Sequence, residues 1–320
     1  MTQDTHHGYL KVIKPGPLTT LQDAGRFGVR RLGITQGGPA DLHAWAWANW
    51  LLGNPWGTPA LEITLGGLEL KAEQDCTLAL CGADLGATLD GELVSCWQQF
   101  RLRQGQHLRF AMPVSGVRAY LAVKGGFIAE PVLGSVACVT RDGLGGHQGD
   151  GRKLATDERL AFTAHGGGLT TRKVPEAERP DYRAPANLAL IPGAQVATFT
   201  GDSLFKAFNS PWAVDTRADR MGVRLLGPAL HSSLDSMISE GIALGAVQVP
   251  PDGQPIALLN DRQTIGGYPR LGTLTPLACA RLAQCPAGHP VWLKATAIEA
   301  AQNQYRRFRS NFSDDGRNTG

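Results

Sequence analysis

The chain has 320 residues, of which 42% are hydrophobic and 18% charged, and its formal net charge at pH 7 is +3. This length supports a sizeable core and two domains, and this composition excludes a disordered chain. Because the basic residues are scattered along the sequence, apart from the cluster Arg306, Arg307 and Arg309 near its end, we expect no nucleic-acid partner.

No segment of the sequence indicates membrane contact or a structural metal. The opening MTQDTHHGYL lacks the apolar stretch of a signal peptide, and no run approaches the roughly 18 apolar residues of a membrane span. We therefore expect a cytoplasmic protein. The six cysteines form no Cys-x-x-Cys pair, which argues against a zinc module or a disulfide framework and predicts buried, reduced thiols.

The first half of the chain predicts strands around one helix. In ADLHAWAWANWLLGNP, Asp41 is a candidate N-cap, and Gly53 followed by Asn-Pro is a stop signal. Residues 68–123 then alternate apolar and polar side chains between Gly- and Asp-rich turns, as antiparallel strands do. We predict an N-terminal β lobe over residues 10–165 with an inserted helix at about 41–52.

The second half predicts another lobe of the same class. Residues 166–187 lose apolar periodicity and gain Gly, Pro and charge, which is typical of a linker. A C-terminal β lobe with a terminal helix is expected over 188–308, followed by a flexible tail at 309–320. The predicted fold is mainly β, with two related barrel-like lobes and a few helices.

An internal echo supports the idea of related lobes. The segment GRFGVRRLG at 25–33 recurs with the same spacing as DRMGVRLLG at 219–227. We expect each lobe to contribute one Arg-Gly turn to a common cleft. Arg26 and Arg220, the arginines that precede the shared glycine, are the predicted sources of positive charge.

The segment LLNDRQTIGGYPRLGTL at 258–274 gathers the most polar chemistry. A hydrophobic strand over 256–259 delivers Asp261, Arg262 and Gln263 to its end. An Asp can act as a base, an Arg can bind a carboxylate or phosphate through two parallel hydrogen bonds, and a Gln can match an amide. This set suits a small anion that carries an amide.

Two glycines follow these polar residues. Gly266 and Gly267 are expected to allow backbone torsions that are closed to other residues. The alternative is a purely structural role, in which Asp261 and Arg262 form a salt bridge and the glycines only allow the chain to turn. The residues alone favour the two interpretations about equally.

Several segments together resemble the biotin-dependent carboxyltransferase-like family over about residues 10–300. They are PGPLTTLQDAGRFG at 15–28, GGPAD at 37–41, AWANWLLGNP at 46–55, YLAVKGG at 120–126, DRMGVRLLGP at 219–228 and SEGIALGAVQVPPDGQPIALLNDRQTIGGYPRLG at 239–272. The family includes the C subunit of bacterial 5-oxoprolinase, often labelled allophanate hydrolase subunit 2, and the antagonist of a sporulation-kinase inhibitor.

The resemblance implies a fold, partners and an activity. The lobes would be cyclophilin-like β-barrels, and the partners a kinase-inhibitor-like B subunit and an A subunit. The complex would use ATP with Mg²⁺ to hydrolyse 5-oxoproline, a small lactam, to glutamate. No metal is expected on this chain itself, because its sequence shows no metal-ligand cluster. Two alternatives remain open: biotin-dependent carboxyl transfer to urea or another amide, and non-enzymatic binding of a kinase-inhibitor protein.

Biotin is not expected on this chain, because no lysine follows a methionine. The chain also departs from the family in having Gly37-Gly38-Pro39 where Ser-Gly-Ala is frequent, and Val136-Ala137-Cys138 where Ser-Thr follows LGS. The first departure removes a hydroxyl and leaves the substrate open.

The residues that we predict to form the site fall into two groups. The predicted catalytic residues are Asp261, Arg262 and Gln263, and the predicted substrate-binding residues are Thr264, Gly266, Gly267, Tyr268, Arg220, Arg26 and Gln248. Among these, Tyr268 is expected to pack over the ligand.

Overall fold

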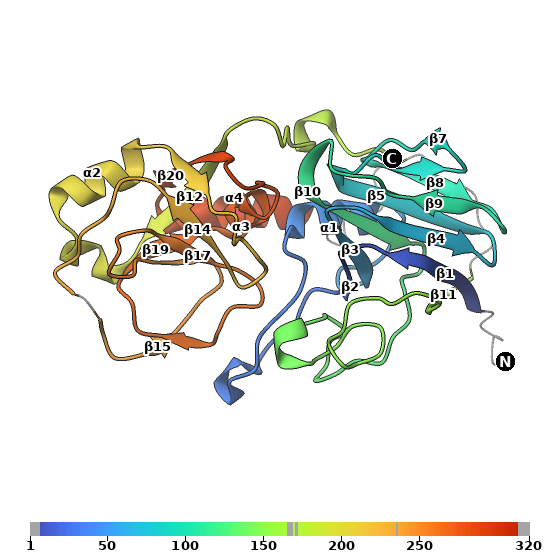
Figure 1. The fold of residues 1–320 in the computed structure, drawn as a ribbon, viewed down its shortest axis with the longest axis horizontal. Coiled ribbons are helices and arrows are strands. Elements are labelled where there is room, and N and C mark those ends of the chain that lie inside the picture. The colour runs from blue at the N-terminus through green and yellow to red at the C-terminus, as the bar shows by residue number, and fades with distance from the viewer. Residues whose placement is uncertain (1–6, 165–168, 170–171, 235, 313–320) are drawn as a thin grey trace. The chain divides into compact units, whose positions relative to one another are not determined.

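The computed structural model describes residues 7–164, 169, 172–234 and 236–312, which form two compact units (Figure 1). Unit 1 is Met1–Phe27 with Gly37–Asp181, and unit 2 is Gly28–Gln36 with Tyr182–Gly320. The chain therefore passes between the units at 27/28, 36/37 and 181/182. Residues 166–168, 170 and 171 of the expected linker and residues 313–320 of the expected tail lie outside the described residues.

The described part of unit 1 contains two antiparallel sheets. The larger has the strand order β11 (Arg159–Thr163), β1 (His7–Pro15), β4 (Leu68–Ala72), β9 (His107–Arg109), β6 (Thr88–Leu89) and β7 (Glu92–Leu93). The smaller has the order β2 (Leu18–Gln22), β3 (Ala60–Thr64), β10 (Ser115–Val123), β5 (Cys76–Asp84) and β8 (Gln98–Leu102). Apolar side chains from both sheets form one buried core.

Helix α1 (Leu42–Leu51) explains why β5 and β10 are buried almost along their whole length. One face of these strands contributes to the core, and α1 packs against the pair. The helix begins where the sequence predicts, because the side chain of Asp41 accepts a hydrogen bond from the Ala44 amide at 3.0 Å. Its residues Trp45 and Trp47 are buried.

Unit 2 is built on a closed barrel. Its strand order is β12 (Ala186–Pro192), β19 (Arg270–Leu274), β16 (Ala246–Gln248), β17 (Ile256–Leu258), β14 (Gly222–Leu226), β13 (Trp212–Val214) and β20 (Pro290–Ala295). The barrel encloses a second apolar core. A two-stranded sheet, β15 (Glu240–Gly241) with β18 (Ile265–Gly266), is formed by residues that lie just before β16 and just after β17 in the chain.

In the described residues of unit 2, three helices accompany the barrel. They are α2 (Gly201–Asn209), which packs on β20, and α3 (Pro276–Leu282) and α4 (Ile298–Ser310), which pack on β12. The short 3-10 helices are η1 (Arg30–Leu32), η2 (Thr140–Asp142), η3 (Glu176–Glu178) and η4 (Ala194–Thr198). In the part of the chain that is described, no helix is both long and apolar enough to cross a membrane.

The predicted mainly β class with a few helices is confirmed. The closed barrel expected of each lobe is present in unit 2, whereas the described strands of unit 1 pair into two separate sheets. The echoed segments also differ in structure. In the first, Gly28 and Gly33 have positive φ angles of 78° and 77° around η1; in the second, Gly222 begins strand β14. The two segments are therefore similar in sequence but differ in local structure.

Candidate functional site

The strongest concentration of buried polar groups in unit 2 follows strand β17. Asn260, Asp261 and Arg262 are consecutive, and each is at most 5% exposed. The strand ends at Leu258, so the residues predicted from the sequence to lie at a strand end do so. Burying three polar side chains in a row is costly unless each finds a partner.

Asp261 finds its partner in Arg220. Two parallel hydrogen bonds join them, from Arg220 Nε to Asp261 Oδ2 at 2.8 Å and from Arg220 Nη2 to Asp261 Oδ1 at 2.9 Å. The Asp261 amide also donates to the Arg220 carbonyl at 2.8 Å. The alternative of an Asp261–Arg262 salt bridge is therefore wrong: the carboxylate binds Arg220. This pair is a rigid, charge-neutral support beside Arg262.

Arg262 is bound chiefly by carbonyl groups. Its Nε donates to the Ile242 carbonyl at 3.3 Å and its Nη1 to the Leu259 carbonyl at 3.1 Å. Among the described residues, no carboxylate forms a salt bridge with this guanidinium. Burial, reinforced by the nearby charge of Arg30, lowers the pKa of Arg262 to about 10. The side chain remains a cation at neutral pH, in a place where an anion would stabilise it.

Ile242 connects the groups around Arg262. Its carbonyl accepts hydrogen bonds from Arg262 and also from Nη2 of Arg30, and its amide donates to the Thr264 carbonyl at 2.9 Å. Arg30 belongs to the segment 28–36 of unit 2. From the same segment, the Thr35 hydroxyl donates to the Arg262 carbonyl at 3.3 Å. A stretch from the N-terminal part of the chain thus completes this site.

Gln248 brings a carboxamide to the same region. It is the last residue of β16 and is 3% exposed, and its Nε2 makes no hydrogen bond to any described residue. A buried amide donor without a partner costs roughly 1–3 kcal/mol, so its position points to a ligand group. A Cβ on Gly266 would lie 2.8 Å from this nitrogen and 2.4 Å from Cδ1 of Ile242.

The reason for the two glycines differs from the prediction. Neither Gly266 nor Gly267 has a positive φ angle, so unusual torsions are not what these positions require. Space is the cause. A Cβ on Gly266 would strike Ile242 and Gln248, and one on Gly267 would lie 2.7 Å from the Met237 carbonyl oxygen.

The other predicted site residues are spread around this centre. Gln263 and Thr264 are half-buried directly after Arg262, and Tyr268 is 43% exposed at the end of the segment. Arg26 belongs to unit 1, where its guanidinium donates to the carbonyls of Val132 at 3.0 Å and Ser135 at 3.1 Å. Arg30, Thr35 and Ile242 were missed. The echo contained Arg30, but nothing in the sequence distinguished it from Arg26.

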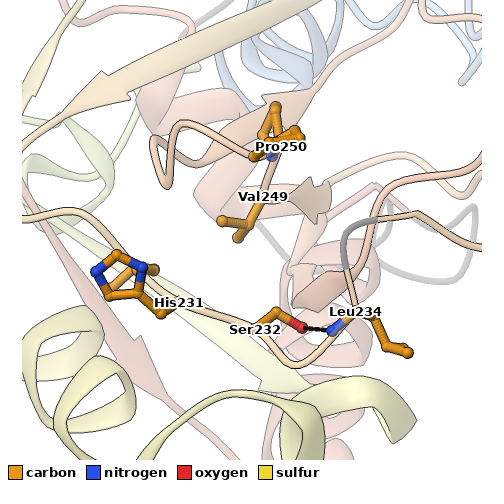
Figure 2. A pocket seen from close by; sticks show the side chains of 7 residues that line it. His231, Ser232, Leu234, Val249 and Pro250 are labelled. Atoms are coloured by element: carbon orange, nitrogen blue, oxygen red, sulfur yellow. Dashed lines mark hydrogen bonds between the residues drawn. The ribbon is translucent and has the colours of Figure 1, made fainter.

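A separate small pocket in unit 2 does not involve these residues. Figure 2 shows His231, Ser232, Leu234, Val249 and Pro250 around it, with the Leu234 amide donating to the Ser232 hydroxyl at 3.1 Å. Its lining contains none of the predicted site residues. In the described residues, no group of three or more His, Cys, Asp or Glu side chains is arranged to hold a metal ion.

Comparisons with known proteins identify the kind of chain that carries this site. The family model described as "Carboxyltransferase domain, subdomain A and B" matches residues 32–295. The C subunit of the Escherichia coli 5-oxoprolinase is 39% identical over 305 residues, which cover 93% of this chain and 96% of that protein. The C subunit of the Haemophilus influenzae 5-oxoprolinase is 34% identical, covering 90% of this chain and 91% of that protein.

A solved structure supports the fold. The urea amidolyase of K. lactis superimposes with a TM-score of 0.89 at 23% identity over 98% of this chain. This chain spans only 20% of that much longer protein. The family match over most of the sequence and the near full-length relatives agree: this chain belongs to the carboxyltransferase-domain family, subdomains A and B.

Proposed function

We propose that this chain is the C subunit of an ATP-dependent 5-oxoprolinase, a complex that hydrolyses 5-oxoproline to glutamate together with an A subunit and a kinase-inhibitor-like B subunit. The observation that carries the proposal is the near full-length similarity to the C subunit of the E. coli 5-oxoprolinase, at 39% identity over 93% of this chain and 96% of that one. A match of this extent leaves no large region of either chain without a counterpart.

The site chemistry suits a lactam. A ring amide offers one carbonyl acceptor and one N–H donor, and a carboxamide side chain offers the complementary pair. Gln248 is buried, with an Nε2 that no described residue engages, so a lactam carbonyl would satisfy it. Gln263 provides a second, half-buried carboxamide next to Arg262.

Arg262 and Asp261 have different roles in this proposal. A cation that is already fixed in place binds an anionic substrate with little reorganisation. Arg262 is such a cation, held by the carbonyls of Ile242 and Leu259. Asp261, bound by Arg220, fixes the backbone that presents Arg262. Thr264, Gly267 and Tyr268 would complete the wall around the ring.

An amide carbonyl is a poor electrophile, and ATP with Mg²⁺, bound at the level of the complex, supplies the activation that hydrolysis requires. The described residues of this chain do not contain a carboxylate cluster for the metal. The residues of this chain are assigned to binding the lactam and fixing its orientation.

The test is reconstitution. The chain is co-purified with A and B subunits, and glutamate release from 5-oxoproline is measured with and without ATP. We expect release only in the presence of ATP and of all the subunits. Full activity of this chain alone would disprove the subunit assignment. Unchanged release by an Asp261→Ala, Arg262→Ala double variant that is folded by circular dichroism would disprove the site assignment.

The same preparation separates two other functions. Consumption of bicarbonate along with ATP would indicate carboxyl transfer to urea or another amide, with biotin supplied by another chain. Tight binding of the B subunit that survives Arg262→Ala, with no turnover of any lactam, would indicate a regulatory binding protein.

A further inference from the structure

Two arginines share one carbonyl oxygen in unit 2. Nη2 of Arg30 and Nε of Arg262 both donate to the Ile242 carbonyl, and Ile242 is itself completely buried. The two arginines come from positions more than 200 residues apart in the chain. Among the residues that the structure describes, neither guanidinium forms a salt bridge with a carboxylate.

The two positive charges of this pair are not balanced by a salt bridge to a carboxylate among the described residues. Two like charges that share a neutral acceptor repel each other, and Arg262 is only 3% exposed, so water screens the repulsion poorly. Arg30 is half-buried and remains partly accessible. An anion that reached Arg30 and Arg262 together would remove the repulsion and gain charge-assisted hydrogen bonds from two planar guanidinium groups.

The rest of the site indicates which anion. Ile242, whose carbonyl is bound by both arginines, also places its side chain against Gly266, beside the buried carboxamide of Gln248. The two guanidinium groups, which can bind an anion, and the Gln248 carboxamide, which can pair with an amide, therefore all lie around Ile242. 5-Oxoproline carries a carboxylate on the carbon next to the ring nitrogen.

We propose that Arg30 and Arg262 together bind the carboxylate of 5-oxoproline, so that Arg30 determines specificity for a lactam that carries an acid. This inference rests on the proposed function and adds to it a residue from outside the segment 258–274. Two neighbouring guanidinium groups suit a carboxylate, because each of its two oxygens can accept charge-assisted hydrogen bonds.

The experiment compares Arg30→Gln and Arg30→Lys with wild type in the reconstituted complex. Arg31→Gln is the matched control, because Arg31 is exposed in the same 3-10 helix. Loss of a charge-assisted pair predicts that Arg30→Gln raises KM for 5-oxoproline by about ten- to a hundredfold. KM for ATP should stay unchanged, Arg30→Lys should recover part of the loss, and Arg31→Gln should behave as wild type.

2-Pyrrolidinone, the same ring without the carboxylate, identifies the group that Arg30 recognises. Its inhibition constant should be equal in wild type and Arg30→Gln, since it has no carboxylate to lose. An unchanged KM for 5-oxoproline in Arg30→Gln overturns the inference. So does a rise in KM for ATP without one for 5-oxoproline, which would assign the arginines to phosphate.

Failure of the proposed function is recognised separately. If the wild-type complex releases no glutamate, the proposed function fails. Binding of the carboxylate by Arg30 is then tested by calorimetric titration of the full chain with 5-oxoproline and with 2-pyrrolidinone. Binding of 5-oxoproline that weakens about tenfold or more in Arg30→Gln supports it. Absence of binding, or equal binding by wild type and variant, overturns it.

Discussion

Asp261 and Arg220 neutralise each other where almost no water reaches them. Their side chains are 7% and 8% exposed, and the two hydrogen bonds between them are short and parallel. The contribution of such a pair is best seen by removing one partner, because the attraction between the charges is then lost while the cost of burying the remaining charge persists.

We predict that Asp261→Asn lowers the free energy of unfolding by about 3–5 kcal/mol, since it breaks the buried ion pair with Arg220. Urea unfolding followed by circular dichroism measures the change. The control is Arg101→Gln, which removes the exposed ion pair with Asp75 and should change the midpoint little. Equal effects of the two substitutions would contradict the distinction between a buried and an exposed pair.

Gly266 tests whether space is what the site requires. We predict that Gly266→Ala costs about 1–3 kcal/mol of stability by overpacking and raises KM for the lactam, because the new methyl group displaces Ile242 or Gln248. Gly241→Ala is the control on the paired strand β15, where a Cβ meets nothing within 4 Å. Unfolding midpoints and steady-state kinetics of both variants check the prediction, which an unaffected Gly266→Ala would contradict.

Sequence reasoning predicted the position of part of the candidate site. The order of polar residues after a hydrophobic run predicted that Asp261 and Arg262 lie at a strand end, and they follow β17. It could not choose the partner of Asp261, because Arg220 lies 41 positions earlier and nothing local relates the two. Arg30 could not be identified from the sequence for the same reason, since its contact with Ile242 spans 212 positions.

At the scale of elements, signals that act within a few residues were the most informative. Asp41 caps α1 as expected, and the alternation over 68–123 corresponds to strands β4 to β10. Helices α2 and α3, of 9 and 7 residues, were not predicted. Such short helices depend on packing against the barrel more than on their own propensity. Closure of the barrel itself depends on pairing between strands far apart in sequence, such as β12 with β20.

The cap of α3 is a testable local signal. The Thr275 hydroxyl accepts a hydrogen bond from the Ala278 amide at 3.2 Å, and Pro276 occupies the first turn. Thr275→Ala should lower the free energy of unfolding by about 1 kcal/mol, while Thr275→Ser, which keeps the hydroxyl, should recover most of the loss. Urea unfolding measures both. If serine were no better than alanine, packing of the threonine methyl group would be responsible instead of the cap.

At the scale of the whole molecule, both units keep their thiols largely away from solvent. All six cysteines are reduced thiols, and burial raises the pKa of Cys76, Cys96 and Cys279 to about 12 and that of Cys285 to about 11. A thiol must lose its proton before it can be alkylated. The folded protein is therefore protected both by burial and by the shortage of thiolate.

We predict that iodoacetamide at pH 8 labels no cysteine of the folded chain and all six after unfolding in urea. A thiol with a pKa near 12 is thiolate in roughly one molecule in ten thousand at that pH. Because the unfolded chain loses these protons near pH 9 and the folded chain near pH 12, the thiols contribute stability below pH 9 that is lost progressively as pH rises between these values. Intact mass spectrometry counts the labels, and rapid labelling of the folded chain would contradict the prediction.

The segment 28–36 bears on how such a chain can evolve. It is encoded within the first part of the sequence but belongs to unit 2, where it supplies Arg30 and Thr35. A recombination breakpoint near residue 181 would transfer a barrel without these two side chains, and a donor of unit 1 would keep a loop without its binding partner. An exchange of the barrel keeps the contacts of Arg30 and Thr35 only if it also carries residues 28–36.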